Sequence, residues 1–425
     1  MDFDVIIVGG GAAGFFTAIQ LARLQPEQKI LILERGKQVL TKVKISGGGR
    51  CNVTHAIFDP NEFVNAYPRG KRELKGPFHK FCSGDVFAFF ESCGVSLKIE
   101  EDGRVFPVSD SSQTIIDCFL DQINSLGVKL NTGCAVKTIQ KTDSQTALWN
   151  VVTNQGDFQT AQVVVTTGSN PKMWALLENM GHSIVSAVPS LFTFNIKDDR
   201  IQGLMGLSTD AEVSLLDDAG RTIDLGNPNS ATSIGPLLIT HWGMSGPAIL
   251  KLSAWGARAL HHLNYKFKIR VNWLPQYNLE TMVSRLTELK QEQAKKQVHN
   301  TRPFDLPKRL WLKLLEAIGI STQTKWADMS KALLRSLAEQ LTQCQFKVDG
   351  KSTFKEEFVT AGGVDLKEIN FKTYESKICS SLYLAGEVLD IDAVTGGFNF
   401  QNAWTGGFIV ANAISEKRNK ESSRN

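Results

Sequence analysis

The sequence predicts an α/β fold in which a parallel sheet, built from both ends of the chain, is interrupted by a long insert. An apolar run at 3–8 leads into a glycine-rich turn and then into a stretch with helical spacing. A second apolar run that ends in a glycine turn lies at 163–168, and similar signals resume after about residue 355. Such uninterrupted apolar runs are typical of parallel strands that are buried on both faces.

The first 34 residues predict a βαβ unit, with strands at 3–8 and 30–34 and a helix over 15–24. Beyond it, the apolar spacing predicts further elements of the same domain. These are an amphipathic helix at 113–126, strands at 128–130 and 135–139, and a small antiparallel meander through 148–153 and 158–165.

The pattern changes after Pro189. Short alternating stretches and turn residues predict a mostly β region, and from Leu279 to about Gln345 the spacing becomes helical, with one helix ending at Gly319. We therefore expect four segments: a nucleotide-binding domain at 1–189, a β-rich insert at 190–275, a helical insert at 276–355 and the return of the first domain at 356–425.

Composition narrows the classes of function. The 425 residues carry a net charge of only +4, which suits an anionic small ligand and gives no reason to expect a nucleic-acid partner. Seven cysteines form no CxxC pair and no His/Cys metal spacing, so we expect free thiols and no metal site. No stretch approaches the ~20 apolar residues of a membrane span, and no signal peptide is evident. We expect a cytoplasmic protein; its oligomeric state stays open.

A G-x-G-x-x-G motif, Gly9–Gly14, follows the first strand. Gly9 permits a tight turn, Gly11 lets a pyrophosphate approach the backbone, and Gly14 lets the next helix pack closely on the sheet. Twenty residues later Glu34 ends the second strand, where a carboxylate can accept hydrogen bonds from a ribose. In this context the motif predicts a Rossmann-type dinucleotide site, with a purely structural turn as the alternative.

A second glycine-rich segment indicates FAD rather than NAD. Residues 42–52 carry three consecutive glycines together with Ser46, Arg50 and Asn52, just after the expected ribose site. A loop rich in donors can contact the remainder of a long cofactor. The alternative is an ordinary surface loop.

The chain resembles the BaiN/YhiN-like FAD-dependent oxidoreductases, bacterial flavoproteins related to the glutathione-reductase-type FAD fold. The resemblance rests on Gly9–Gly14, on Lys-Ile-Ser-Gly-Gly-Gly-Arg-Cys-Asn at 44–52, on the Thr-Thr-Gly at 166–168, and on the C-terminal segment 384–403 with its Thr-Gly-Gly-Phe-Asn block. It spans essentially the whole chain, including blocks at 240–248 and 359–364 of the insert and return.

The resemblance implies that FAD is bound non-covalently by residues of several segments. They are Gly9, Gly11, Ala12, Ala13, Gly14, Glu34, Arg35, Lys44, Ser46, Gly47, Gly48, Arg50, Cys51, Asn52, Val136, Thr167, Gly168, Gly386, Glu387, Asp390, Gly397, Phe398 and Asn399. It further implies that 396–399 lead into a helix at 403–414 whose N-terminal dipole faces the flavin and stabilises its reduced form.

No catalytic acid or base is identified from the sequence. Cys51 has no second cysteine within a few positions, so we interpret it as a packed side chain rather than a redox thiol. His241 is a candidate proton donor, against the alternatives of a structural histidine or of helix capping at Ser245.

The resemblance implies an FAD-dependent oxidoreductase acting on a small molecule. NAD(P)H is a candidate transient donor, although only one G-x-G-x-x-G is present, and an enone-type compound or dioxygen is a candidate acceptor. Three alternatives remain: an oxidase of small amines, a non-catalytic redox sensor and a tRNA-modifying flavoprotein.

Overall fold

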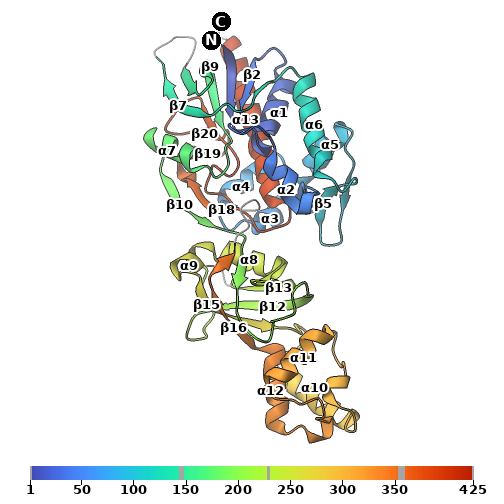
Figure 1. The fold of residues 1–425 in the computed structure, drawn as a ribbon. Coiled ribbons are helices and arrows are strands. Elements are labelled where there is room, and N and C mark those ends of the chain that lie inside the picture. The colour runs from blue at the N-terminus through green and yellow to red at the C-terminus, as the bar shows by residue number, and fades with distance from the viewer. Residues whose placement is uncertain (1, 143–147, 227–229, 353–358, 424–425) are drawn as a thin grey trace. The chain divides into compact units, whose positions relative to one another are not determined.

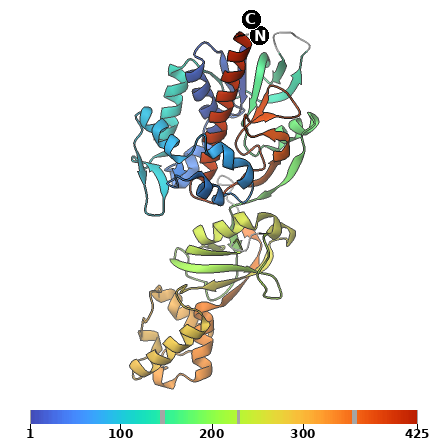
Figure 2. The same ribbon diagram turned by 180° about the vertical axis from the view of Figure 1, so that it is seen from behind.

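A computed structural model of the chain describes residues 2–142, 148–226, 230–352 and 359–423 (Figures 1 and 2). The chain forms two compact units, Met1–Val188 with Lys355–Asn425, and Pro189–Phe354. The first crossing between the units lies one residue from the expected boundary after residue 189. The expected boundary after residue 355 lies outside the described residues.

The first unit contains a sheet whose centre is parallel. Its five parallel strands lie in the order β21 (Leu382–Leu384), β9 (Gly156–Val165), β1 (Phe3–Val8), β2 (Ile30–Leu33) and β6 (Lys129–Asn131). The pairing of β21 with β9 shows how the C-terminal segment completes a sheet begun at the N-terminus. The central strands contain buried apolar runs, such as those of β1, β2 and the end of β9, as is typical of a parallel sheet with both faces covered.

Antiparallel strands extend the sheet beyond β9 and beyond β21. β7 (Val136–Lys141) and β8 (Trp149–Thr153) form a meander with β9, as the alternating sequence predicts. β19 (Ile369–Asn370) and β20 (Glu375–Ser376) lie beyond β21.

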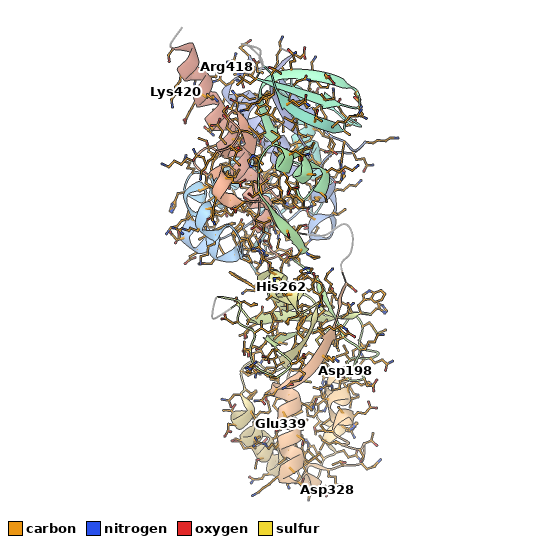
Figure 3. The ribbon with its side chains drawn as sticks, turned by 90° about the vertical axis from the view of Figure 1, so that its left-hand side faces the viewer. Asp198, His262, Asp328, Glu339, Arg418 and Lys420 are labelled. Carbon is orange, nitrogen blue, oxygen red and sulfur yellow. The ribbon has the colours of Figure 1, made fainter. Side chains whose placement is uncertain are left out.

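Two helices from opposite ends of the chain, α1 (Ala12–Leu24) and α13 (Phe398–Ser422), pack side by side (Figure 1). A Cβ at Gly407 would lie 3.0 Å from the backbone nitrogen of Thr17, so this glycine allows the close approach. Arg418, labelled in Figure 3, forms a 3.9 Å ion pair with Asp4 of β1.

Smaller elements complete the first unit. The helices are α2 (Thr41–Gly49), α3 (Pro60–Phe63), α4 (Lys71–Phe78), α5 (Ser83–Ser92), α6 (Ser112–Ser125) and α7 (Pro171–Asn179). A three-stranded sheet contains β3 (Thr54–His55), β5 (Arg104–Pro107) and β4 (Leu97–Ile99), and β10 (Ile184–Pro189) pairs with β18 (Thr360–Val364).

The second unit combines an antiparallel sheet with helices. Its strands lie in the order β16 (Cys344–Asp349), β15 (Lys266–Asn272), β12 (Ser208–Leu216), β13 (Thr232–Ile239), β14 (Gly243–Ser245), β11 (Thr193–Asn195) and β17 (Lys351–Ser352). The helices are α8 (Pro247–Trp255), α9 (Ala257–His262), α10 (Leu279–Glu292), α11 (Lys308–Ala317) and α12 (Lys331–Thr342).

The structure does not divide the insert after residue 275, because Pro189–Phe354 forms one compact unit. Trp273 at the end of the sheet and Trp311 and Trp326 of the helical part belong to one buried cluster. A shared core makes the two parts one folding unit, which alternating and helical patterns alone do not reveal. Among the described residues, no helix is long and apolar enough to cross a bilayer.

Candidate cofactor site

The three motif glycines after β1 have different roles. A Cβ at Gly9 (φ +118°) would lie 2.6 Å from the carbonyl oxygen of Thr166, and one at Gly14 would lie 2.1 Å from the carbonyl oxygen of Gly9. Both positions are therefore fixed by backbone packing. A Cβ at Gly11 would have nothing within 4 Å among the described atoms. Gly11 thus leaves open a space that a side chain would fill.

This open space lies at the N-terminus of α1. Gly11 is the N-cap residue, makes no side-chain capping bond, and is followed by a first turn without acidic residues. The free N–H groups and the positive end of the helix dipole favour an anion there, as a pyrophosphate would require. Gly386 borders the same turn, since its Cβ would lie 3.2 Å from that of Ala13.

Glu34 is held by the backbone on both sides of the turn. One carboxylate oxygen accepts from the N–H of Gly10 at 2.8 Å and the other from that of Gly36 at 2.7 Å. The carboxylate is only partly buried, so its remaining lone pairs can accept from a ribose. Arg35 is exposed next to it, and Val136 begins β7 after the neighbouring strand β6.

The second glycine segment begins as a helical turn and then unwinds. Ser46, Gly47 and Gly48 of α2 have non-helical backbone angles, and Gly47, Gly48 and Gly49 all have positive φ. Gly48 and Gly49 have open space where a Cβ would stand. The backbone of this loop is therefore accessible to a ligand. The hydroxyl of Ser46 donates to the carbonyl oxygen of Val43 at 2.9 Å.

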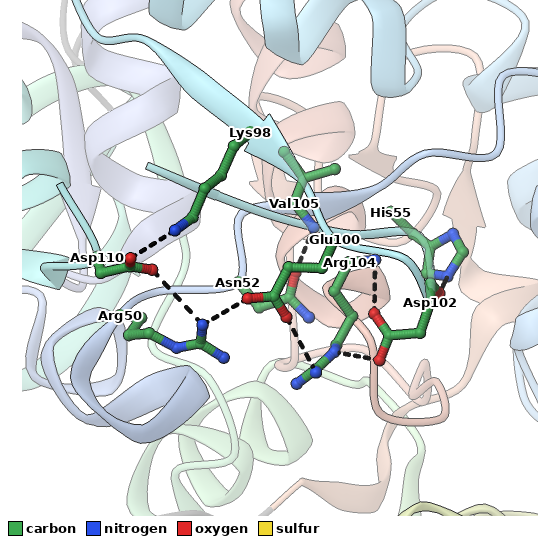
Figure 4. Close-up of polar contacts among 9 residues, drawn as sticks. All are labelled: Arg50, Asn52, His55, Lys98, Glu100, Asp102, Arg104, Val105 and Asp110. Carbon is green, nitrogen blue, oxygen red and sulfur yellow. Dashed lines mark hydrogen bonds and ion pairs between the residues drawn. The ribbon is translucent and has the colours of Figure 1, made fainter. Parts of the chain in front are cut away.

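Arg50 and Asn52 are directed into the structure around this loop (Figure 4). The Arg50 guanidinium lies 2.6 Å from Glu100, 3.5 Å from Asp110 and over the ring of Phe106. The Asn52 side chain accepts from the N–H of Val105 at 3.2 Å. These side chains secure the loop to the three-stranded sheet. Their contact with the cofactor stays a prediction.

The C-terminal segment lies against the two glycine loops. Glu387 forms an ion pair with Lys42, and a Cβ at Gly168 would lie 3.8 Å from the Glu387 carboxylate. A Cβ at Gly397 would lie 2.4 Å from the carbonyl oxygen of Thr54, so the 395–399 turn touches the residues that follow the glycine loop. Thr167 has a buried hydroxyl without a partner among the described residues. Together these features fit a long phosphate-containing cofactor.

The C-terminal helix begins earlier than expected. It starts at Phe398 rather than at about Ala403, so Phe398 and Asn399 form its first turn instead of a loop leading into it. The Asn399 side chain is bonded to the backbone of Ala393, and the hydroxyl of Tyr67 donates to the carbonyl of Phe398 at 2.5 Å. These contacts stabilise a turn whose asparagines and aromatics have poor helix propensity.

His55 lies beside this turn. Its ring stacks on Phe398 with 4.8 Å between centroids, and its Nε2 donates to the carbonyl of Asp102 at 3.1 Å (Figure 4). Burial lowers the pKa of His55, which favours the neutral ring. Its Nδ1 is then an acceptor that is buried and has no partner among the described residues.

A buried ion pair, missed by the sequence analysis, holds the segment before the helix. Asp392 is fully buried and pairs with Arg69, whose Nε lies 2.6 Å from the carboxylate. Asp390 is also buried, and its N–H donates to the carbonyl of Val364. Residues 69 and 392 are too distant in sequence for any local pattern to indicate their pairing.

Cys51 is a packed residue with an unreactive thiol. It is fully buried, and burial raises its pKa to about 12. We expect Cys51 to remain protonated, and therefore resistant to alkylation by iodoacetamide, at every pH below about 12 at which the fold persists. Mass spectrometry of the native and the urea-unfolded protein at pH 8 tests this; modification of Cys51 in the native state would contradict it.

The insert residue His241 is exposed in the turn between β13 and β14. Ser245 does not cap α8, whose N-cap is Gly246; its hydroxyl instead accepts from Thr193 at 3.0 Å.

No group of three or more His, Cys, Asp or Glu side chains suited to a metal ion occurs within the described ranges. Lys44 is exposed at the start of the second glycine loop.

Comparisons with known proteins agree with this architecture. A family model described as "HI0933-like protein Rossmann domain" matches residues 3–413. The chain is 29% identical over 422 residues to a 3-dehydro-bile acid delta(4,6)-reductase of Clostridium scindens, covering 97% of this chain and 98% of that protein. It is 27% identical over 423 residues to a ribosomal RNA dihydrouridine synthase of Haemophilus influenzae, covering 97% and 98%.

A further relative and a solved structure extend the comparison. The Escherichia coli ribosomal RNA dihydrouridine synthase is 27% identical over 417 residues, covering 96% of this chain and 97% of that protein. The structure of 3-ketosteroid-delta4-(5alpha)-dehydrogenase from Rhodococcus jostii RHA1 is similar with a TM-score of 0.53 at 13% identity, covering 97% and 96% of the two chains. At that identity the likeness shows the fold alone.

Proposed function

The chain belongs to the HI0933-like Rossmann family and is an FAD-dependent oxidoreductase; from this premise we propose that it reduces carbon–carbon double bonds conjugated to a carbonyl group. The proposal rests on the kind of double bond that the names of the relatives say is reduced. A 3-dehydro-bile acid delta(4,6)-reductase acts on double bonds in conjugation with a ketone. Dihydrouridine differs from uridine by reduction of the ring double bond conjugated to a carbonyl. Both reactions add a hydride and a proton to the same kind of acceptor.

The residues that would hold FAD line a surface that we call the cradle. It consists of the first turn of α1, Glu34, the 46–49 loop, Gly386 and Gly397. The first turn of α1 would bind the pyrophosphate, Glu34 the adenosine ribose, and the backbone of the 46–49 loop with Gly386 and Gly397 the remainder. When bound, FAD supplies a hydride acceptor and donor. The carbonyl-conjugated substrate needs a proton in addition, and no side chain of the cradle is assigned to that step.

NAD(P)H is proposed as the electron donor. In the described residues the second unit contains only an antiparallel sheet and helices, with no second parallel βαβ unit that would bind a nicotinamide separately. The donor would therefore bind transiently beside the flavin. The oxidase and redox-sensor alternatives correspond to a flavin that no nicotinamide reduces.

Two substrate classes fit the proposed bond change. A small enone is the first, supported by the 29% identical reductase. A uracil in RNA is the second, in contrast to the expectation from the small net charge. It is supported by two relatives and by five exposed lysines of the segment 291–331 that form no ion pair with described residues. They are Lys295, Lys296, Lys308, Lys325 and Lys331.

The reaction is tested by anaerobic mixing of the FAD-loaded protein with NADH or NADPH, followed by addition of an acceptor. We expect the flavin absorbance to bleach with one nicotinamide and to return with a 3-oxo-Δ4 steroid or with uridine-containing RNA. Product analysis for the saturated ketone or for dihydrouridine distinguishes the two substrates. If only dioxygen restores the flavin absorbance, the protein is not a reductase of these acceptors, and an oxidase is favoured. If neither nicotinamide bleaches the flavin, NAD(P)H is not the electron donor.

If RNA is the substrate, its binding should weaken steeply with salt, because phosphate contacts release counterions. Replacing Lys295 and Lys296 by glutamine should then reduce RNA retention without affecting the flavin spectrum. If the unsubstituted protein and the glutamine variant retain RNA equally at all salt concentrations, the small enone is left as the substrate.

A further inference from the structure

One ion pair of the first unit joins the two parts of the chain that form the cradle. Lys42 belongs to the first turn of α2, and Glu387 follows Gly386 in the return segment. The lysine side chain is 49% exposed and the glutamate side chain 17% exposed. The sequence analysis placed Glu387 in the cofactor site and did not place Lys42 there.

The Glu387 carboxylate lies at the edge of the sheet where the parallel strands end. β9 and β21 pair side by side, and a Cβ at Gly168, beyond β9, would lie 3.8 Å from Glu387 Oε2. Gly386, the preceding residue, borders the first turn of α1, since its Cβ would lie 3.2 Å from that of Ala13. Ligands of open parallel sheets bind outside the carboxyl ends of the strands. The carboxylate therefore lies beside the helix end at which we place the pyrophosphate.

Lys42 reaches the same edge from the other side of the first glycine turn. The N–H of Leu40, the N-cap residue of α2, donates to the carbonyl of Gly10 at 2.9 Å. This bond fixes the start of α2 against the turn, and Lys42 contacts Glu387 from there. The ion pair thus connects the N-terminal part of the chain with its return close to the first turn of α1.

The charges around this turn require a cation. A pyrophosphate bound at the first turn of α1 is an anion, and the neighbouring Glu387 carboxylate would repel it. Arg50, a second cation of the glycine loops, is bonded to Glu100 and Asp110. Lys42 contacts the carboxylate that borders the turn. An ammonium group carries three N–H donors, so it can bond to a carboxylate and a phosphate at once.

We propose that Lys42 is a phosphate ligand of the cofactor site and that Glu387 positions it. The ammonium pairs with Glu387 and donates to a pyrophosphate oxygen, which also reduces the repulsion between the two anions. Lys42 would then favour ligands that carry a pyrophosphate over those that do not. This inference rests on the proposed place of the FAD pyrophosphate and not on the proposed reduction of conjugated double bonds.

The test is to titrate the apo-protein with FAD, ADP and adenosine at several salt concentrations. We expect Lys42→Met to raise the Kd of FAD and of ADP about tenfold or more at low salt, because a bond between charged groups is lost. The Kd of adenosine, which has no phosphate, should stay the same. The FAD affinity of the variant should also depend less on salt, because the lost attraction is one that salt screens. Lys42→Arg keeps the charge and should retain most of the affinity.

Lys29→Met is the matched control for the loss of one positive charge. Lys29 is exposed and precedes β2, at the opposite end of this strand from Glu34. This variant should bind FAD and ADP as the unsubstituted protein does. Chemical denaturation of the apo-variants checks that the fold is unchanged, as expected for exposed lysines.

Two outcomes contradict the phosphate contact. If Lys42→Met weakened ADP and adenosine equally, the lysine would only hold the segments of the cradle together. If the Kd of FAD and of ADP did not change, the ion pair would have no part in binding. Neither outcome depends on electron transfer, so a failure of the reductase proposal in the nicotinamide experiment would leave this result unaffected.

Discussion

Gly11→Val should abolish the retention of FAD while leaving the fold intact. The Gly11 backbone has φ −97° and ψ −170°, which valine can adopt, and no described atom lies within 4 Å of the added Cβ. The side chain would fill the space that a pyrophosphate needs. We expect a cost of about 3 kcal/mol to FAD binding, which is about a hundredfold in Kd. Flavin content after purification and titration of the apo-protein measure it.

Two other glycine variants separate loss of binding from loss of folding. Gly76→Val places the same side chain at an exposed position of α4, where no atom lies within 4 Å of the Cβ, and should retain normal FAD content. Gly14→Ala should destabilise the protein itself, because its Cβ would lie 2.1 Å from a backbone oxygen. Gly11→Val at the N-cap should cost only about 1 kcal/mol of stability. If the purified Gly11→Val protein had a normal FAD content, the pyrophosphate would have to bind elsewhere.

Asp392→Ala should destabilise the first unit by about 3–5 kcal/mol, because it leaves the Arg69 guanidinium buried without its ion partner. The side chains of Asp392 and Arg69 are only 0% and 11% exposed. The pair also secures the segment that leads into α13, so FAD retention should fall as well. Chemical denaturation of the apo-protein measures the stability without a contribution from the cofactor.

Two controls test the physical reason for this loss. The double variant Arg69→Met/Asp392→Leu removes both charges and should recover most of the stability, since an apolar pair of similar volume can replace a buried ion pair. Lys98→Ala breaks an exposed pair with Asp110 in the same unit and should have a far smaller effect. If Asp392→Ala and Lys98→Ala were equally stable, burial of the Arg69–Asp392 pair would not contribute.

Much of the site could be predicted from the sequence because it depends on neighbours along the chain. The apolar runs of β1, β2 and β9, the glycines between β1 and α1, and an acid at the end of β2 are local patterns with a fixed period or spacing. They determine the parallel sheet and the cradle. Two blocks of specific residues, around 46–52 and 395–399, additionally identified the family.

Only the tertiary structure distinguished the residues that shape the cradle from those that could contact a cofactor. Gly11 and Gly14 occur in one motif, yet one faces open space and the other a carbonyl oxygen. Arg50 and Asn399 are predicted from the sequence to contact the cofactor, and the structure shows in addition that their polar groups bond to Glu100 and Ala393. A side chain's partner is set by the three-dimensional position of the competing donors and acceptors, which local spacing does not encode.

The same reason explains the early start of α13, the single core of the insert and the ion pairs of Lys42 with Glu387 and Arg69 with Asp392. Each depends on contacts between residues that are far apart in the chain. The sequence by itself determined the fold class and the family, and it predicted where the cofactor site lies. Packing between the two ends of the chain decided which groups remain available for binding, because those ends meet only in the folded sheet.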